Sequence, residues 1–386
     1  MTALIFFLVA MVLHIAPPQA VFSGFSSAAW WLVFGGLIVG AGVERTGLGK
    51  RLARAMFGRL GASYTRAVAA VALAAVALAF LMPSTMGRVV LLMPIGLVMT
   101  AALGTYVPAT GILPASVPTS VLIGAAEQLY GIRLTYGPYL LLHFPVLGLG
   151  YMAILIPVVA RLFRDTPVPR PDPDATRGMS RDERVLGWIL ALALLGYALD
   201  FLHGVSPAWI SLAAGLACLL PGIAIVSPKL FGERVNLAVL VYIAAIIGVG
   251  GVVEHTGLGT RLGASLIQLA GLAPGASAYD FGAIVALCVL IGLATTVIPI
   301  PAVLGPLAAD IAAASGLPLL TVLMIYVIGF AVILVPYQSG PLVVAMQLGG
   351  VSTRQGMRLT LVMGGATVLV LAPLAYGWWR LLGWIG

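Results

Sequence analysis

Long apolar runs separated by short polar segments extend along the whole chain. A membrane-spanning helix requires about 20 consecutive, mostly apolar residues. About nine runs are predicted to span a bilayer: 3–20, 26–43, 107–130, 138–163, 184–203, 206–227, 235–253, 319–349 and 356–381. The short alternating strands typical of a transmembrane barrel are not visible in the sequence. The pattern therefore predicts an all-α polytopic membrane protein.

Two further apolar segments are each interrupted near the middle by proline and hydroxyl residues. Segment 66–104 contains Met82-Pro-Ser-Thr-Met86, and segment 278–316 contains Ala294-Thr-Thr-Val-Ile-Pro299. The arms are short enough for either two spans or one re-entrant hairpin, and charge counting does not separate these alternatives. We expect hairpins, because the backbone groups freed at such a tip can bind a ligand inside the protein.

Two of the predicted spans carry a similar interruption. Span 107–130 contains Pro118–Gln128, and span 319–349 contains Val335–Pro341. A broken helix presents amide groups at one end and carbonyl groups at the other, which suit anions and cations respectively. We expect these two broken helices and the two hairpin tips to meet at one site near the middle of the membrane.

A nine-residue motif occurs twice, 210 residues apart. Glu44-Arg-Thr-Gly-Leu-Gly-Lys-Arg-Leu52 and Glu254-His-Thr-Gly-Leu-Gly-Thr-Arg-Leu262 are identical at seven of nine positions, and each follows a long apolar run. The spans between the copies place them on opposite sides of the membrane, so the sequence predicts an inverted-repeat transporter. The expected parts are an N-terminal helix (1–25), a first repeat (26–163), a cytoplasmic linker (164–183), connecting helices (184–234) and a second repeat (235–386).

Composition and charge agree with this class of protein. The chain is 61% hydrophobic and only 8% charged, which excludes an ordinary water-soluble core. With a cytoplasmic N-terminus, the loops on the cytoplasmic side hold 16 of the 20 Lys and Arg residues. The net charge of +8 is therefore a topology signal of a bacterial-type inner or plasma membrane protein, and no nucleic-acid partner is expected.

Four segments, in order, resemble the divalent anion:sodium symporter family of the ion-transporter superfamily. The segment that begins at Phe22-Ser-Gly-Phe resembles the opening helix of that family, and Ser84-Thr-Met-Gly-Arg-Val-Val-Leu-Leu-Met-Pro94 falls at its Ser-Asn-Thr motif. Thr119-Ser-Val-Leu-Ile-Gly-Ala-Ala-Glu-Gln128 and Pro336-Tyr-Gln-Ser-Gly-Pro341 resemble its two loops at broken helices. The resemblance extends from about residue 20 to residue 370.

The resemblance implies a homodimeric, elevator-type carrier of small anions of the dicarboxylate, citrate or sulfate class. In that family the two Ser-Asn-Thr tips bind substrate carboxylates and sodium ions. Here the asparagines are missing, because Ser84-Thr85-Met86 and Thr295-Thr296 stand at those places. The coupling ion is therefore open between Na⁺, H⁺ and none, and no other cofactor is expected.

The candidate site residues are the polar groups at the four interruptions and the charged groups near them. The candidates for binding substrate are Ser84, Thr85, Arg88, Thr119, Ser120, Thr295, Thr296, Gln338 and Ser339. The candidates for a coupling ion are Ser84, Gly124, Glu127 and Asp310. Asp200 and Asp280 lie near predicted span ends, where we expect them to be solvated.

Arg88 is the one basic residue predicted inside the membrane, where an unpaired arginine costs about 2.5–3.5 kcal/mol or more. Three interpretations remain open at this point. Its guanidinium binds a substrate carboxylate, or its fixed charge replaces a sodium ion, or it forms an internal ion pair with Glu127 or Asp310.

Other functions fit the sequence less well. We find no catalytic triad, phosphate loop or metal-binding motif, so an enzyme is not expected. A cation/proton antiporter or an arsenite-type exporter of the same superfamily is one alternative, although a cation antiporter should carry paired acids at its breaks. An anion channel is another, and counterflow of labelled substrate would separate a carrier from a channel.

Overall fold

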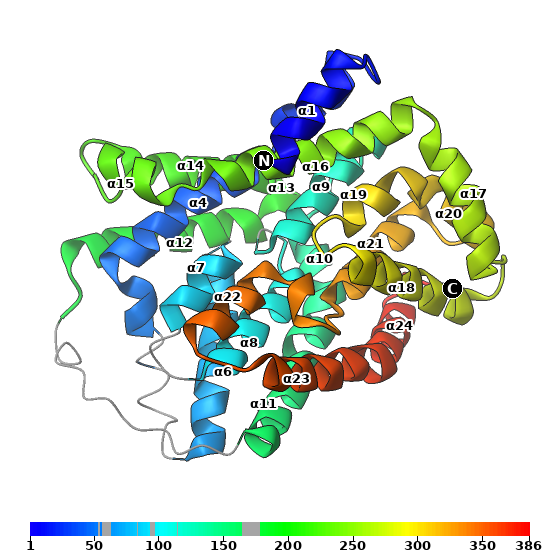
Figure 1. Cartoon of the computed structure of the whole chain (residues 1–386). Helices are drawn as coiled ribbons and strands as arrows, with labels where there is room; N and C mark the ends of the chain where they lie inside the picture. Colours follow the sequence, from blue (N-terminus) through cyan, green and yellow to red (C-terminus); the bar gives the residue numbers. More distant parts are fainter. Residues whose placement is uncertain (53–54, 56–62, 83, 93–96, 114, 164–177) are drawn as a thin grey trace.

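A computed structural model describes residues 1–52, 55, 63–82, 84–92, 97–113, 115–163 and 178–386 (Figure 1). These residues form helices, with no β-strand among them. Five helices are long and apolar enough to cross a membrane: Tyr64–Leu81, Tyr136–Leu162, Leu237–His255, Ser277–Ala294 and Thr353–Leu381. A sixth span results if Ile300–Ser315 and Leu319–Ala331, bent by 117°, are counted as one. The all-α polytopic class is confirmed.

The described part of the chain thus has fewer continuous spanning helices than the nine predicted. Two predicted spans contain only short helices, α1 (Thr2–Val12) and α14 (Pro207–Leu219). The span predicted at 319–349 is divided into α21 (Leu319–Ala331) and α22 (Gly340–Leu348). Hydropathy records how long an apolar run is, whereas the helix ends depend on proline and on packing.

The two halves of the chain contain similar series of helices. The first half runs through α4 (Ala28–Thr46), α6 (Tyr64–Leu81), α7 (Thr85–Leu92), α8 (Val98–Thr110), α9 (Val117–Tyr130), α10 (Tyr136–His143) and α11 (Tyr151–Leu162). The second runs through α16 (Leu237–His255), α17 (Leu258–Ala270), α18 (Ser277–Ala294), α19 (Ile300–Leu304), α20 (Ala308–Ser315), α21, α22, α23 (Thr353–Ala366) and α24 (Ala372–Leu381). In each half the last two helices are joined by a π-helical segment, Phe144–Gly150 or Thr367–Leu371.

The repeated nine-residue motif ends a helix in both halves. Gly47 directly after α4 and Gly257 just after α16 both adopt left-handed backbone conformations, with φ of 78° and 64°. Glycine adopts this conformation without the steric penalty of other residues, so the first glycine of the motif terminates the preceding helix. The opposite orientation of the two copies, and the domain limits, stay predictions.

The helices pack in two groups. In the first unit, α4 and α14 lie side by side with α12 (Arg181–Ala198), α15 (Pro228–Arg234) and α16 beside them (Figure 1). A Cβ atom on Gly35 would lie 2.3 Å from the carbonyl oxygen of Ser211, so α4 and α14 meet backbone to backbone. The contact depends on the absence of a side chain at Gly35, because small residues allow helices to approach closely.

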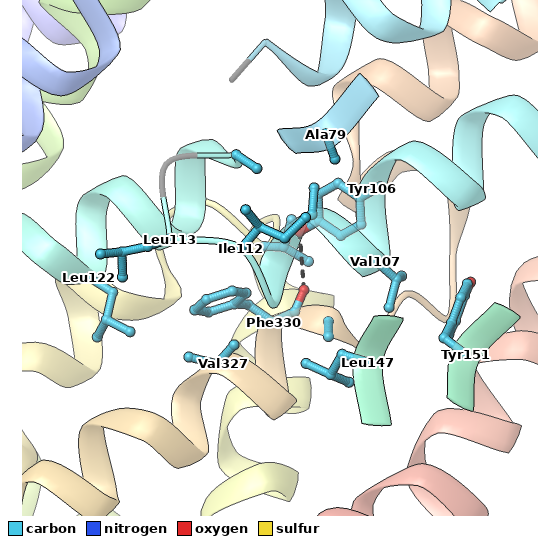
Figure 2. Packing of buried hydrophobic residues seen from close by; sticks show 14 of the residues in the cluster. Ala79, Tyr106, Val107, Ile112, Leu113, Leu122, Leu147, Tyr151, Val327 and Phe330 are labelled. Atoms are coloured by element: carbon cyan, nitrogen blue, oxygen red, sulfur yellow. Dashed lines mark hydrogen bonds between the residues drawn. The ribbon is translucent and has the colours of Figure 1, made fainter. Parts of the chain in front are cut away.

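In the second unit, α6 packs on α8, α18 on α21, and α22 on both α7 and α8. Helices α8 and α21 form its centre, since Met99–Thr110 and Thr321–Ala331 are buried throughout. The Tyr106 hydroxyl on α8 donates a hydrogen bond of 3.1 Å to the Phe330 carbonyl on α21 (Figure 2). Helix α9 contacts α4 and α16 on one side and α19 on the other, so it lies between the units.

One prediction about pH arises at the start of α12. The Arg51 guanidinium donates a hydrogen bond of 2.9 Å to Glu183, and together with the Ser180 amide it holds the pKa of that carboxyl below its ordinary value. A carboxyl whose folded pKa is lowered stabilises the fold above its unfolded pKa, and this contribution is lost as pH falls through the folded pKa.

Glu183→Gln should therefore lower the thermal midpoint at neutral pH and reduce its loss on acidification below about 4.3, the ordinary pKa of glutamate. The matched control is Glu233→Gln on the exposed face of α15. Differential scanning fluorimetry across pH measures both variants. Identical pH profiles for Glu183→Gln and wild type would contradict the expectation.

Candidate functional site

The first half of the chain has its second break earlier than predicted. The prediction of a break at Pro118–Gln128 is wrong, because α9 is continuous from Val117 to Tyr130. Pro118 lies in the first turn of α9, where its missing N–H costs no helical hydrogen bond. The chain instead leaves helix α8 after Thr110 and re-enters helix at Val117. Thr119 and Ser120 therefore lie just inside a helix.

Both of these hydroxyl residues are buried and engaged with the start of α9. The Ser116 side chain caps the helix and lies 2.6 Å from the Thr119 hydroxyl. The Ser120 hydroxyl donates to the Ser116 carbonyl at 3.1 Å. Ser116 satisfies an amide group that the first turn of the helix leaves free, and the hydroxyls of Thr119 and Ser120 are held by Ser116.

The helix breaks where the tip of the first hairpin was predicted, but the second arm differs from the prediction. Helix α6 ends at Leu81 and α7 begins at Thr85, as the sequence predicted around Met82–Met86. Helix α7 ends at Leu92, whereas the predicted arm extends to residue 104. The later part of that arm belongs to α8, and residues 93–96 lie outside the described part.

Arg88 on α7 is completely buried, and its side chain joins the two breaks of the first half. Its Nη1 donates to the carbonyl of Met82, directly after α6. Its Nη2 donates to the carbonyl of Ala115, directly before the cap of α9, at 2.9 Å. The ion pair proposed with Glu127 or Asp310 is absent among the described residues, where Glu127 lies 4.0 Å from Arg133 instead.

The two breaks of the second half meet as the sequence predicted. Helix α18 ends at Ala294, and the Val297 amide donates to the Gln338 carbonyl at 3.2 Å. The Tyr337 hydroxyl donates to the carbonyl of Leu293 on the same helix end. The hairpin tip and the break between α21 and α22 therefore form one structural unit.

The candidate residues in this unit differ in whether their polar groups already have hydrogen-bond partners. Thr295 is exposed, but its hydroxyl donates to the Ile291 carbonyl at 2.7 Å, and Thr296 is half-buried. The Gln338 side-chain oxygen accepts hydrogen bonds from the amides of Leu334 and Val335 at 2.8 and 2.9 Å. This side chain thus replaces the hydrogen bonds that the backbone loses after α21.

Two donor groups at this break are buried without a partner in the described structure. They are the Nε2 amide group of Gln338 and the hydroxyl of Ser339, whose residues are 1% and 2% exposed. A buried polar group without a partner costs about 1–3 kcal/mol, so its presence calls for a ligand or a function. Both groups precede the N-terminus of α22, where the helix dipole favours an anion.

The four residues predicted for a coupling ion have separate surroundings. The Ser84 hydroxyl accepts a hydrogen bond from the Gly87 amide at 3.1 Å. Gly124 packs where a Cβ would lie 2.7 Å from Ile247 and 3.1 Å from Ala29, so it serves close helix packing. Glu127 is paired at the end of α9, and Asp310 is half-buried on α20.

The expectation that Asp200 and Asp280 are solvated is wrong. Asp200 is 4% exposed and accepts a hydrogen bond of 2.5 Å from the Tyr136 amide at the start of α10. Asp280 is fully buried and accepts one of 3.2 Å from the Ala273 amide. Each carboxylate folds against a backbone amide of another segment, which the linear sequence does not indicate.

A cavity of about 450 Å³ lies along α9 and α16. Its walls come from the segment after α1 and from α9, α16 and α19: Pro17, Gln19, Ala20, Ser23, Val121, Ala125, Gln128, Leu129, Ile247, Gly250, Gly251, Glu254, His255 and Ala302. Its size is within the range of small-molecule sites. The residues predicted for the site do not line it, and the motif residues Glu254 and His255 do.

Sequence reasoning missed several groups that build the site. Ser116 caps α9, and a Tyr-Val pair stands at similar places on the two central helices, Tyr106-Val107 on α8 and Tyr326-Val327 on α21. The Tyr326 hydroxyl donates to the Leu304 carbonyl at 3.1 Å. Alignment of the two halves beyond the nine-residue motif would have revealed the tyrosines.

The chain has recognisable relatives. A family model described as a citrate transporter matches residues 1–330. A protein of Cupriavidus necator described as a membrane protein is 25% identical over 404 aligned residues, which cover 94% of this chain and 77% of that protein. Among solved structures, the Alcanivorax borkumensis YdaH transporter, described as having an unusual topology, gives a TM-score of 0.65 at 18% identity, with 95% of this chain and 88% of that chain covered.

Proposed function

Since the chain belongs to the citrate transporter family, we propose that it is a secondary active carrier of di- and tricarboxylate anions. Membership of this family confirms the resemblance to small-anion transporters and identifies a multi-pass membrane transporter rather than an enzyme. The likeness to the solved transporter supports the fold alone. The anion class, the coupling and the mechanism are proposals.

The main support for an anionic substrate is the pair of free hydrogen-bond donors at the break between α21 and α22. The Gln338 amide group and the Ser339 hydroxyl are both buried and unpartnered among the described residues, and they precede the N-terminus of α22. Carboxylate oxygens accept hydrogen bonds from such groups, and broken helices of transporters direct their N-termini at anionic substrates. A cation would leave the Gln338 amide group without a partner there.

We further propose that the second unit moves against the first in an elevator-type cycle. In support, α9 meets the first unit through a small residue, Gly124, which packs against Ala29 and Ile247. A cavity lies along α9 where it faces α16. A cytoplasmic N-terminus and a homodimer complete the proposal, from the charge distribution and the resemblance respectively.

The test is the thermal midpoint of the purified protein with citrate, dicarboxylates, sulfate, arsenite and simple cations. A ligand that binds the native state raises the midpoint, by about 2.7 kcal/mol of stability at 100 times its dissociation constant. We expect citrate or a dicarboxylate to give the largest shift, and internal citrate to accelerate uptake of labelled citrate into proteoliposomes.

Other results would support the alternatives. A response to arsenite or to cations only would favour the exporter or antiporter of the same superfamily. Citrate-dependent flux without counterflow would favour an anion channel.

A further inference from the structure

Four oxygen atoms from separate segments surround the end of the Arg88 side chain. A single nitrogen, Nη2, has the Ala115 carbonyl at 2.9 Å, the Thr85 hydroxyl at 3.0 Å and the Thr105 carbonyl at 3.1 Å. A guanidinium Nη carries only two hydrogens, so the three acceptors surround it more as ligands surround a cation.

The origin of these oxygens supports this interpretation. The carbonyls of Met82 and Ala115 belong to the two breaks of the first half, where backbone oxygens are not all used by helices. Met82 directly follows α6, and the C-terminal end of a helix carries a partial negative charge. We refer to the carbonyls of Met82, Thr105 and Ala115 with the Thr85 hydroxyl as the oxygen cage.

The surroundings of the buried Arg88 charge support the same interpretation of the oxygen atoms as cation ligands. Arg88 is 0% exposed, and no carboxylate pairs with it in the part of the chain that the structure describes. Its Nε has no partner there either. The side chain is therefore positioned by its terminal nitrogens, and backbone and hydroxyl dipoles, rather than an acid, stabilise the buried positive charge.

We propose that the oxygen cage is a site for a small monovalent cation that Arg88 occupies with its own guanidinium. Main-chain carbonyls at broken helices and hydroxyl oxygens are the ligands that sodium finds in other transporters. In this chain the positive charge at the breaks of the first half is covalent, and its helix α7 packs on α22, which begins at the proposed anion site. Carriage of the anion then does not require sodium. The inference deepens the proposed function and rests on it for the role of the charge.

The test removes the side chain and asks whether sodium takes its place. Arg88→Ala exposes the cage, so sodium chloride should raise its thermal midpoint by about one degree or more over choline chloride at equal ionic strength. Arg88→Lys retains a positive charge next to the cage. This variant, like wild type, should show no difference between the two salts.

The outcomes separate this inference from the proposed function, because the measurement contains no anionic substrate. A folded Arg88→Ala protein without a sodium response would overturn the oxygen cage as a cation site, while a citrate shift in wild type would still support anion carriage. If Arg88→Ala does not fold, uptake of labelled citrate by wild-type protein in proteoliposomes tests the inference instead. Uptake that is unchanged when choline replaces sodium supports it, and uptake that requires sodium overturns it.

Discussion

Replacement of Gln338 by glutamate should abolish anion binding and leave the fold intact. The glutamate retains an oxygen in place of Oε1, which accepts from the amides of Leu334 and Val335, so the break after α21 stays satisfied. It replaces the unpartnered Nε2 donor with a second, negatively charged oxygen. Loss of a hydrogen bond to a charged ligand costs about 1.5–3 kcal/mol, and the added repulsion brings the loss of affinity to about a hundredfold or more.

The measurement is the citrate-induced shift of the thermal midpoint, with the midpoint without ligand as a measure of folding. Gln347→Glu is the matched control, since Gln347 is exposed on the same helix, α22. The control should retain the wild-type shift. A Gln338→Glu protein that still responds to citrate would show that the anion binds elsewhere.

Replacement of Gly329 by alanine should destabilise the second unit strongly. A Cβ atom on Gly329 would lie 2.1 Å from Cβ and 2.6 Å from Sγ of Cys288, so α18 and α21 cannot keep their present distance. Overpacking in a rigid core costs about 1–3 kcal/mol, and here the obstacle is close to the backbone of both helices, so we expect about 3 kcal/mol.

A second substitution distinguishes this clash from a general effect of helical glycine. Cys288→Gly removes the obstructing atoms, and the double variant Cys288→Gly with Gly329→Ala should recover most of the stability lost in Gly329→Ala. Gly282→Ala is the control, because a Cβ at Gly282 on α18 has open space around it. Thermal midpoints measure all four proteins, and additive losses in the double variant would refute the direct clash.

The parts of the fold that the sequence predicted correctly are those that depend on short local patterns of apolar, proline and glycine residues. Helix α18 follows a continuous apolar run and ends where threonine and proline begin, so its limits of Ser277–Ala294 lie close to the predicted arm of 278–293. The break between α21 and α22 was likewise found, because Pro336, Gly340 and Pro341 all disfavour a continuous helix there. The broad class followed from such runs and from their repetition, whereas the family was indicated by four segments that resemble it in order.

The break predicted at Pro118–Gln128 was misplaced because the prediction relied on the proline. Pro118 and Pro336 look alike in sequence, yet Pro118 lies in the first turn of α9 and Pro336 in the break itself. The difference depends on where the preceding helix stops, and α8 stops at Thr110 within a fully buried surrounding. Proline occurs both in the first turn of a helix and in a helix break. Only the neighbouring residues in space decide which of the two applies.

The sequence by itself determined the class of protein, the two similar halves and the polar interruptions, since these depend on residues adjacent in the chain. Only the tertiary structure decided what the polar groups do. Arg88 reaches Ala115, 27 residues away, and the Gln338 carbonyl accepts from Val297, 41 residues away (338 minus 297). Hydrogen bonds between distant segments decide which donors are satisfied and which remain free for a ligand, and no local pattern records them.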